Sequence, residues 1–249
     1  MRNLLSAKYF KFIPLVLIGM IYFTMTNPQT AHAMHIMEGF LPPKWSIIWI
    51  IVFIPFLIAG LFRIRKLVVA DQHNKLLLAL CGAFIFVLSA LKIPSVTGSC
   101  SHPTGVGLAT VLFGPLVVSV FGAIVLLFQA LLLAHGGITT LGANAVSMAV
   151  AGPIVGFLVY KLARKFGCRQ GFSIFLCAFI ADLATYLVTS VQLGIVFPDP
   201  ASGMMASIFK FMAIFCTTQV PIAIAEGLLT TIMYNLIRKN LPEKVAQLQ

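Results

Sequence analysis

The sequence is short of charge, and of acidic charge above all. Only 9% of its 249 residues are charged, and Asp and Glu together number six against 17 Lys and Arg. A soluble domain of this length needs far more charge to cover its surface, so that class is excluded. Hydrophobic residues make up 60% of the chain and the mean hydropathy is +1.02, which is typical of a membrane-embedded protein.

Two further patterns are missing. The five cysteines are scattered, with neither a paired C-x-x-C zinc site nor a disulfide framework, so we interpret them as small core hydrophobes. No G-x-x-x-x-G-K-[ST] occurs, which excludes ATP hydrolysis through a P-loop. The net charge of +11 sits in short clusters between apolar runs and not on one polar face, which argues against nucleic-acid binding.

The first 33 residues have the order of a secretory signal peptide. A basic start from Arg2 to Lys11 precedes an apolar run from Phe12 to Met25 that is too short for a comfortable membrane span, and Ala31-His32-Ala33 forms an A-x-A site. We predict cleavage after Ala33, which leaves residues 34–249 as a single membrane-embedded unit. An uncleaved signal anchor is the alternative.

Basic clusters set the expected orientation, because positively charged loops stay in the cytoplasm. They lie at 63–75, 161–169 and 238–239. With an outer N-terminus and cytoplasmic basic clusters, successive crossings must alternate in direction, and this alternation requires two crossings within 105–134. Gly114-Pro115 is the best place to divide this stretch, because proline disfavours a continuous helix. We therefore expect an all-α polytopic protein with about seven transmembrane helices after signal-peptide removal, an outer N-terminus and a cytoplasmic C-terminus. The expected spans are 45–62, 76–91, 105–134 as two, 144–160, 172–192 and 204–236.

The new N-terminus would carry a chelating group. The Met34 amine, the His35 backbone nitrogen and the His35 imidazole can close a five- and a six-membered ring around one metal ion. Such a planar nitrogen set suits Ni(II) or Cu(II), and Co(II) is less demanding. Both the amine and the imidazole must be unprotonated to bind, so affinity should fall at lower pH. An ordinary surface histidine is the alternative for His35.

A second histidine is expected on the same side of the membrane. His102 lies in a glycine- and hydroxyl-rich loop, 93–105, and could supply the fourth nitrogen. Its alternative role is to cap the helix that follows. His135 opens the next outer loop, where it could orient or shield a ligand or simply face solvent.

The segment Met34-His35-Ile36-Met37-Glu38-Gly39-Phe40-Leu41-Pro42 closely resembles the mature N-terminus of the CbiM/NikM family, the substrate-specific components of energy-coupling-factor transporters for cobalt and nickel. Segments 94–105 and 136–144 are similar to that family as well. The resemblance implies metal ligands at Met34, His35 and His102. Ser-His-Pro-Thr-Gly at 101–105 looks more like the cobalt branch, whereas Met37 stands where many relatives carry proline.

The same resemblance implies a function in the cell membrane. Co(II), or else Ni(II), would be the transported substrate, with no resident cofactor and no enzymatic activity, and the cobalt would supply cobalamin biosynthesis. The implied partners are a CbiQ-like coupling subunit, a CbiO-like ATPase and a CbiN-like accessory subunit.

Two alternatives belong to other classes. A zinc enzyme built on His35, His102 and His135 is disfavoured because no H-E-x-x-H motif is present. A secondary transporter is disfavoured because we find no repeat and few intramembrane carboxylates.

Other features within the spans are open to two interpretations. Asp182, Lys210 and Glu226 lie where charges are costly and usually functional, but an Asp182–Lys210 ion pair of structural purpose is equally possible. Ala79-x-x-x-Ala83 and Gly152-x-x-x-Gly156 allow close helix contact. The first pair resembles the motif through which such components meet their coupling subunit, and internal packing is the alternative for both pairs.

Overall fold

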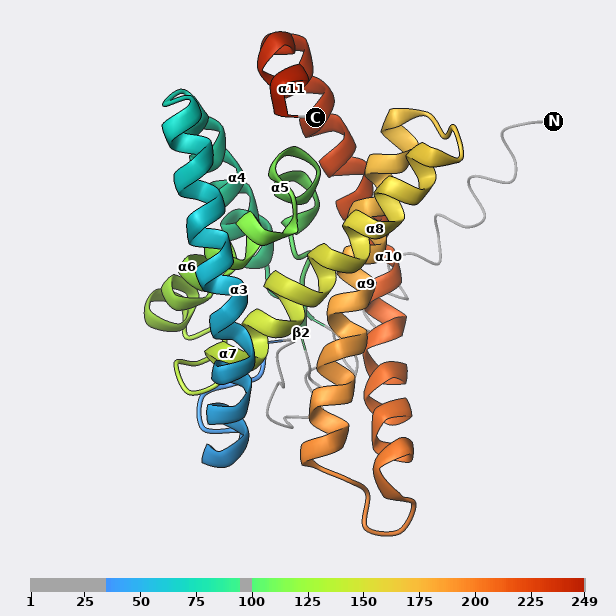
Figure 1. Cartoon of the computed structure of the whole chain (residues 1–249). Helices are drawn as coiled ribbons and strands as arrows, with labels where there is room; N and C mark the ends of the chain where they lie inside the picture. The colour runs from blue at the N-terminus through green and yellow to red at the C-terminus, as the bar shows by residue number, and fades with distance from the viewer. Residues whose placement is uncertain (1–34, 95–99, 249) are drawn as a thin grey trace, which may run out of the picture.

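The apolar runs fold into long helices, because a helix satisfies its backbone polar groups internally where lipid offers no partner. The computed structural model describes residues 35–94 and 100–248 (Figure 1). The predicted signal peptide, 1–33, and Met34 lie outside the described residues, so cleavage after Ala33 stays a prediction. The elements are α3 (Pro43–Ala70), α4 (Asn74–Ser89), β1 (Ile93–Pro94), β2 (Cys100–Ser101), α5 (Val106–Phe113), α6 (Pro115–Leu133), α7 (Leu141–Ala145), the π-helix η2 (Val146–Ala151), α8 (Gly152–Lys165), α9 (Gln170–Val196), α10 (Gly203–Asn240) and α11 (Pro242–Leu248).

Within the described residues, five helical segments are long and apolar enough to cross a membrane. They are α3, α6, α9, α10 and the continuous segment formed by α7, η2 and α8. Only 11% of an apolar 18-residue stretch of α3 is buried. Ile47, Ile51 and Ile58 are among the exposed side chains of this helix. Such an apolar surface is stable against lipid and not against water, which agrees with the predicted all-α, multi-pass class.

The stretch 105–134 differs from the prediction. The helix break at Gly114 is confirmed: its φ of +88° favours glycine, and Pro115 opens α6. However, α5 has only 8 residues, about 12 Å of helix, too short for a full crossing. The expected outer loop instead enters the protein, since His102 and Thr104 are fully buried. The helix α4 is also short, with 16 residues. Helix length alone therefore does not support the predicted count of about seven transmembrane helices.

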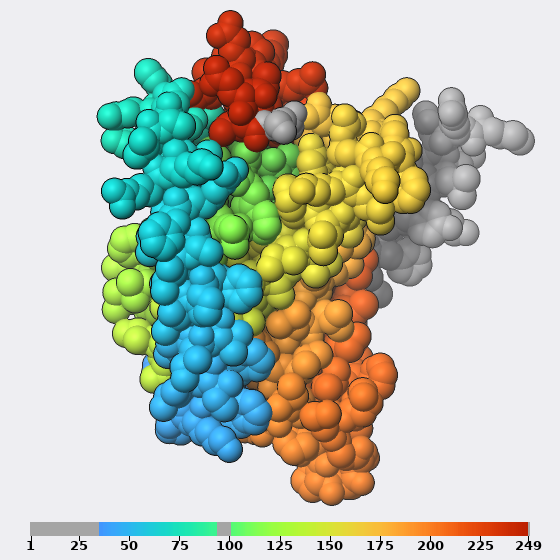
Figure 2. Space-filling model, viewed as in Figure 1, coloured from blue at the N-terminus to red at the C-terminus, as the bar shows by residue number. Residues whose placement is uncertain are grey.

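The basic clusters gather at one end of the molecule. Figures 1 and 2 show the α3–α4 turn, the α8–α9 turn and α11 at that end, with the α9–α10 turn at the opposite end. An ion pair between Lys244 and Asp71 ties α11 to the α3–α4 turn. The predicted sequence of crossings requires the basic clusters to share one end of the molecule. That this end faces the cytoplasm stays a prediction.

The two small-residue pairs have different surroundings. A Cβ at Gly152 would lie 2.3 Å from Thr185 Oγ1, and one at Gly156 would lie 2.6 Å from the Cys177 carbonyl oxygen, so this pair serves the packing of α8 on α9. Ala79 and Ala83, in contrast, are both exposed on α4. Internal packing therefore explains the glycine pair and not the alanine pair.

The cysteines whose side chains are described are free thiols. Cys81 and Cys177 are buried core residues, as the interpretation of the sequence expected. Cys216 departs from it, because it is exposed on α10.

Candidate metal centre

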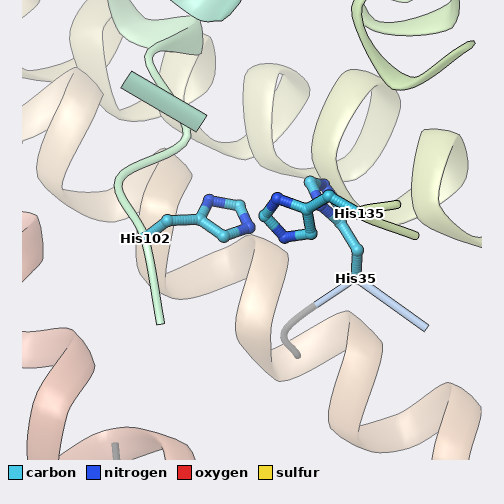
Figure 3. Close-up of side chains that lie close together, drawn as sticks. All are labelled: His35, His102 and His135. Atoms are coloured by element: carbon cyan, nitrogen blue, oxygen red, sulfur yellow. The ribbon is translucent and has the colours of Figure 1, made fainter. Parts of the chain in front are cut away.

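Three histidines from distant parts of the chain converge in the interior (Figure 3). His35 precedes α3, His102 follows β2 and His135 follows α6. The ring centroids are 4.5 Å apart for His35 and His102, 4.6 Å for His35 and His135, and 5.0 Å for His102 and His135. One nitrogen from each ring lies within 4.8 Å of the other two. This spacing lets three imidazoles share one metal ion.

The segment that carries His35 is held by polar side chains at the start of the α7 helix. The Ile36 amide donates to Asn144 Oδ1 at 2.8 Å, and the Ile36 carbonyl oxygen accepts from Asn144 Nδ2 at 3.0 Å and from Thr140 Oγ1 at 2.6 Å. Both backbone groups of Ile36 are therefore satisfied. A Cβ at Gly137 would lie 2.5 Å from Glu38 Cα, so glycine is needed where the two segments meet.

His135 is turned inward by the end of α6. Ala134 has φ +46° and Gly136 has φ +78°, and the His135 amide donates to the Gln129 carbonyl oxygen at 3.1 Å. Two left-handed residues in close succession end the helix and reverse the chain. The His135 side chain is consequently 1% exposed and does not face solvent, which resolves the choice left open by the sequence.

The backbone of His102 is held by α9 and α10. Its amide donates to Tyr186 Oη at 3.1 Å, and its carbonyl oxygen accepts from Tyr186 Oη at 3.2 Å and from Gln219 Nε2 at 3.2 Å. Gln219 Nε2 also donates to Asp182 Oδ2 at 2.5 Å. Asp182 thus fixes the amide that holds His102. Among the described residues Asp182 forms no ion pair with Lys210, which is exposed, so the suggested Asp182–Lys210 pair is wrong.

Glu226 holds the residues that follow His102. Its carboxylate accepts from the Thr104 amide at 2.5 Å, the Gly105 amide at 2.9 Å and the Thr104 hydroxyl at 2.9 Å. Gly105 is also the residue immediately before α5, where a negative charge is favoured by the helix dipole. These bonds explain how a carboxylate is tolerated in the interior of a membrane protein. The role could not be read from the sequence, because Glu226 and Thr104 are 122 residues apart.

Burial keeps the three imidazoles neutral. Loss of water lowers the pKa of His102 to about 4, although its bond to the Pro103 carbonyl opposes the shift. It lowers the pKa of His135 to about 3, aided by the charges of His102 and Lys92. Burial, with the neighbouring His102 and His135, also lowers the pKa of His35 well below its usual range. Neutral imidazole is the form that binds metal.

The nitrogen atoms of the cluster have few partners. His35 Nδ1, His102 Nε2 and both ring nitrogens of His135 are buried without a hydrogen-bond partner among the described residues. Unpaired buried polar atoms are costly, and a cation at the centre would satisfy one nitrogen of each ring. Imidazole donors suit cobalt, nickel, copper and zinc, whereas magnesium and calcium prefer oxygen.

The predicted ligand set is partly visible in this arrangement. His35 and His102 come together as expected, although both are almost fully buried. Met34 lies outside the described residues. His135 lies nearly as close to His35 and His102 as these two lie to each other, whereas the preferred interpretation of the sequence gave it a role in orienting or shielding a ligand, or none. Its predicted place on the same side of the membrane as His35 and His102 was the available signal.

A helical bundle with membrane-spanning segments and a buried cage of imidazoles defines a multi-pass membrane protein equipped to hold a transition-metal ion. The profile of the family described as "CbiM: Cobalt uptake substrate-specific transmembrane region" matches residues 35–244. The chain belongs to this family.

Relatives and solved structures agree with that assignment. The chain is 81% identical to the cobalt transport protein CbiM of Listeria seeligeri over 97% of this chain and 99% of that protein. It is 67% identical to the protein of the same name from Salmonella typhimurium, over 86% of this chain and 88% of the other. A crystal structure of a transition metal transporter superposes with a TM-score of 0.72 at 25% identity, covering 83% of this chain and 93% of that one. The family is one of transport proteins, so the zinc-enzyme alternative is wrong.

Proposed function

We propose that the chain captures Co(II) at the outer face of the cell membrane, as the substrate-binding subunit of an ATP-driven energy-coupling-factor importer. The single observation that carries this proposal is the buried His35, His102 and His135 cluster, in which each ring has at least one nitrogen without a hydrogen-bond partner among the described residues. The proposed ligands are the Met34 amine and His35 on the mature N-terminus, with His102 opposite them. His135 supplies a further imidazole to the same ion.

The proposal includes partner subunits. The family description calls the matched region substrate-specific, and the chain has no P-loop, so energy for uphill uptake must come from elsewhere. A CbiQ-like coupling subunit, a CbiO-like ATPase and a CbiN-like accessory subunit would complete the importer, and its cobalt would serve cobalamin biosynthesis. The exposed Ala79 and Ala83 on α4 supply a small-residue face for the coupling subunit.

A matched pair of variants tests the site. We expect His102→Ala to lower cobalt affinity by more than about 100-fold, because losing a ligand costs more than losing a residue that orients one. His73→Ala is the control, since His73 lies at the other end of α3 from His35 and its side chain is 91% exposed. Cobalt bound to purified, folded protein is measured in a competition titration, with nickel titrated in parallel to test the nickel alternative.

Equal cobalt binding by His102→Ala and wild type would exclude His102 as a ligand. Tighter binding of nickel than cobalt, together with nickel uptake by cells, would favour a nickel importer of the same family. Intact-mass analysis of the membrane-purified protein tests the start at Met34. Retention of Met1 in protein that still imports cobalt would contradict both the cleavage and the role of the amine.

A further inference from the structure

The π-helix η2 carries a fully buried methionine, Met148, beside the metal centre. Segments of π-helix take one more residue per turn and often occur at functional sites. Met148 follows Asn144 by four positions and Thr140 by eight, so the three share one side of the helix. Thr140 and Asn144 hold the backbone of Ile36. Met148, on the same side of the helix, contacts His35, the residue before Ile36.

Met148 contacts the ring of His35 at one defined atom. Its Sδ lies 3.4 Å from His35 Nε2, a hydrogen-bonding distance for sulfur. A thioether can only accept a hydrogen bond, and a neutral imidazole carries one ring hydrogen. As a hydrogen bond, this contact therefore requires the hydrogen on Nε2, where it is donated to the sulfur, and it leaves Nδ1 with a free lone pair.

The free atom is the one that the proposed chelate requires. A six-membered ring that includes the His35 backbone nitrogen closes only through Nδ1, because Nε2 lies on the far side of the imidazole. His35 Nδ1 is buried and has no partner among the described residues. His102 has the complementary arrangement, since its Nδ1 bonds to the Pro103 carbonyl oxygen at 3.1 Å and its Nε2 is unpartnered.

We propose that Met148 is a positioning residue of the metal site, whose sulfur fixes the Nε2–H tautomer and the orientation of His35 and so presents Nδ1 to cobalt. The inference rests on the proposed function. Histidine ligands usually donate their second N–H to a carboxylate or carbonyl oxygen. A thioether does the same without adding charge, so no buried anion remains when the metal leaves the cage.

Substitutions of Met148 separate this role from packing. Leucine has nearly the volume and apolar character of methionine but accepts no hydrogen bond, whereas glutamine is polar and offers an acceptor oxygen. A packing role predicts that Met148→Leu is nearly neutral and that Met148→Gln is harmful. The positioning role predicts the reverse for metal binding: Met148→Leu lowers cobalt affinity by about 10- to 100-fold, and Met148→Gln recovers part of the loss.

The tautomer is measured directly by ¹⁵N NMR of histidine-labelled, metal-free protein, at a pH above about 7 where imidazoles are neutral. The His35 signals are assigned by their loss in His35→Gln. Wild type should show one tautomer with hydrogen on Nε2, and Met148→Leu should show a mixture. Met233→Leu, which removes a partly buried methionine packed against the main core, is the control and should leave both tautomer and affinity unchanged.

Three results would overturn the inference. One is wild-type affinity with a single His35 tautomer in Met148→Leu. Another is hydrogen on Nδ1 in the wild-type protein. The third is sulfur in the first coordination shell of bound cobalt by X-ray absorption, which would make Met148 a ligand itself. Failure of the proposed function is distinguishable, because in that case His35→Ala would also leave cobalt affinity unchanged.

Discussion

The imidazoles of His35, His102 and His135 are neutral because burial removes the water that would stabilise their charged forms. With pKa values of about 4 for His102 and about 3 for His135, protons compete with metal for these two rings only in strong acid. The sequence predicts that protonation of the amine and of the imidazole weakens metal binding at lower pH. In the folded protein the imidazoles lose that sensitivity, and in the proposed site it would fall on the amine of a chain that begins at Met34.

The residue-scale prediction concerns pH. In protein that begins at Met34, the amine has an ordinary pKa of about 8, and chelation also displaces the His35 amide proton. Between roughly pH 6 and 8, the logarithm of cobalt affinity should therefore rise by about two for each pH unit. Competition titrations across this range measure the slope. An affinity that does not change with pH would show that imidazoles alone bind the metal and that the amine is not a ligand.

At the scale of elements, the long helices α9 and α10 fix a segment that has little regular structure of its own. Residues 102–105 are held by Tyr186 and Asp182 from α9, the latter through Gln219, and by Gln219 and Glu226 from α10. Each bond restrains the backbone beside His102 and leaves its Nε2 free. Any relative movement of α9 and α10 would therefore displace His102, one of the proposed ligands.

Glu226→Gln tests this restraint. Its amide NH₂ would face the Thr104 and Gly105 donors, so one buried N–H would lose its acceptor, a cost of about 1–3 kcal/mol. We expect a lower melting temperature and a cobalt affinity reduced by roughly 10-fold, as for residues that orient ligands. The control is Glu243→Gln, because Glu243 is exposed at the start of α11. If the affinity of Glu226→Gln equals that of wild type, the 104–105 backbone does not position His102.

At the scale of the whole molecule, the metal cage and the proposed partner surface are separate. The cage is enclosed by parts of the chain that lie far apart in sequence, whereas Ala79 and Ala83 are exposed on α4. Small exposed residues on a transmembrane helix permit close approach of another helix. Metal capture and subunit assembly should accordingly be separable by mutation.

Ala79→Trp provides that separation. A large side chain at this position should prevent close helix contact, so we expect loss of co-purification with the CbiQ-like subunit and loss of cobalt uptake by cells. Cobalt affinity of the isolated chain should stay within about twofold of wild type, because surface substitutions away from the site have small effects. Ala225→Trp, at an exposed position on α10, is the matched control. Unchanged co-purification of Ala79→Trp would place the interface elsewhere.

The sequence by itself determined the membrane class, most of the long helices and the break at Gly114. The length of an apolar run, a basic cluster and a Gly-Pro step each act on neighbouring residues of the chain. Their consequences can therefore be predicted without knowledge of tertiary contacts. The same reasoning predicts that His35 and His102 lie on one side of the membrane. It did not predict the pair β1 and β2, the helix α11 or the π-helix η2, which depend on contacts between segments.

Only the tertiary structure decided which polar groups serve the site. Met148 has an ordinary sequence context, and the sequence left the roles of His135 and Glu226 open, because all three have partners about 100 or more residues away. It also made Asp182 a partner of Gln219 and not of Lys210. The physical reason is burial: inside a membrane protein every polar atom needs a partner, and which partner it meets is set by how the helices pack.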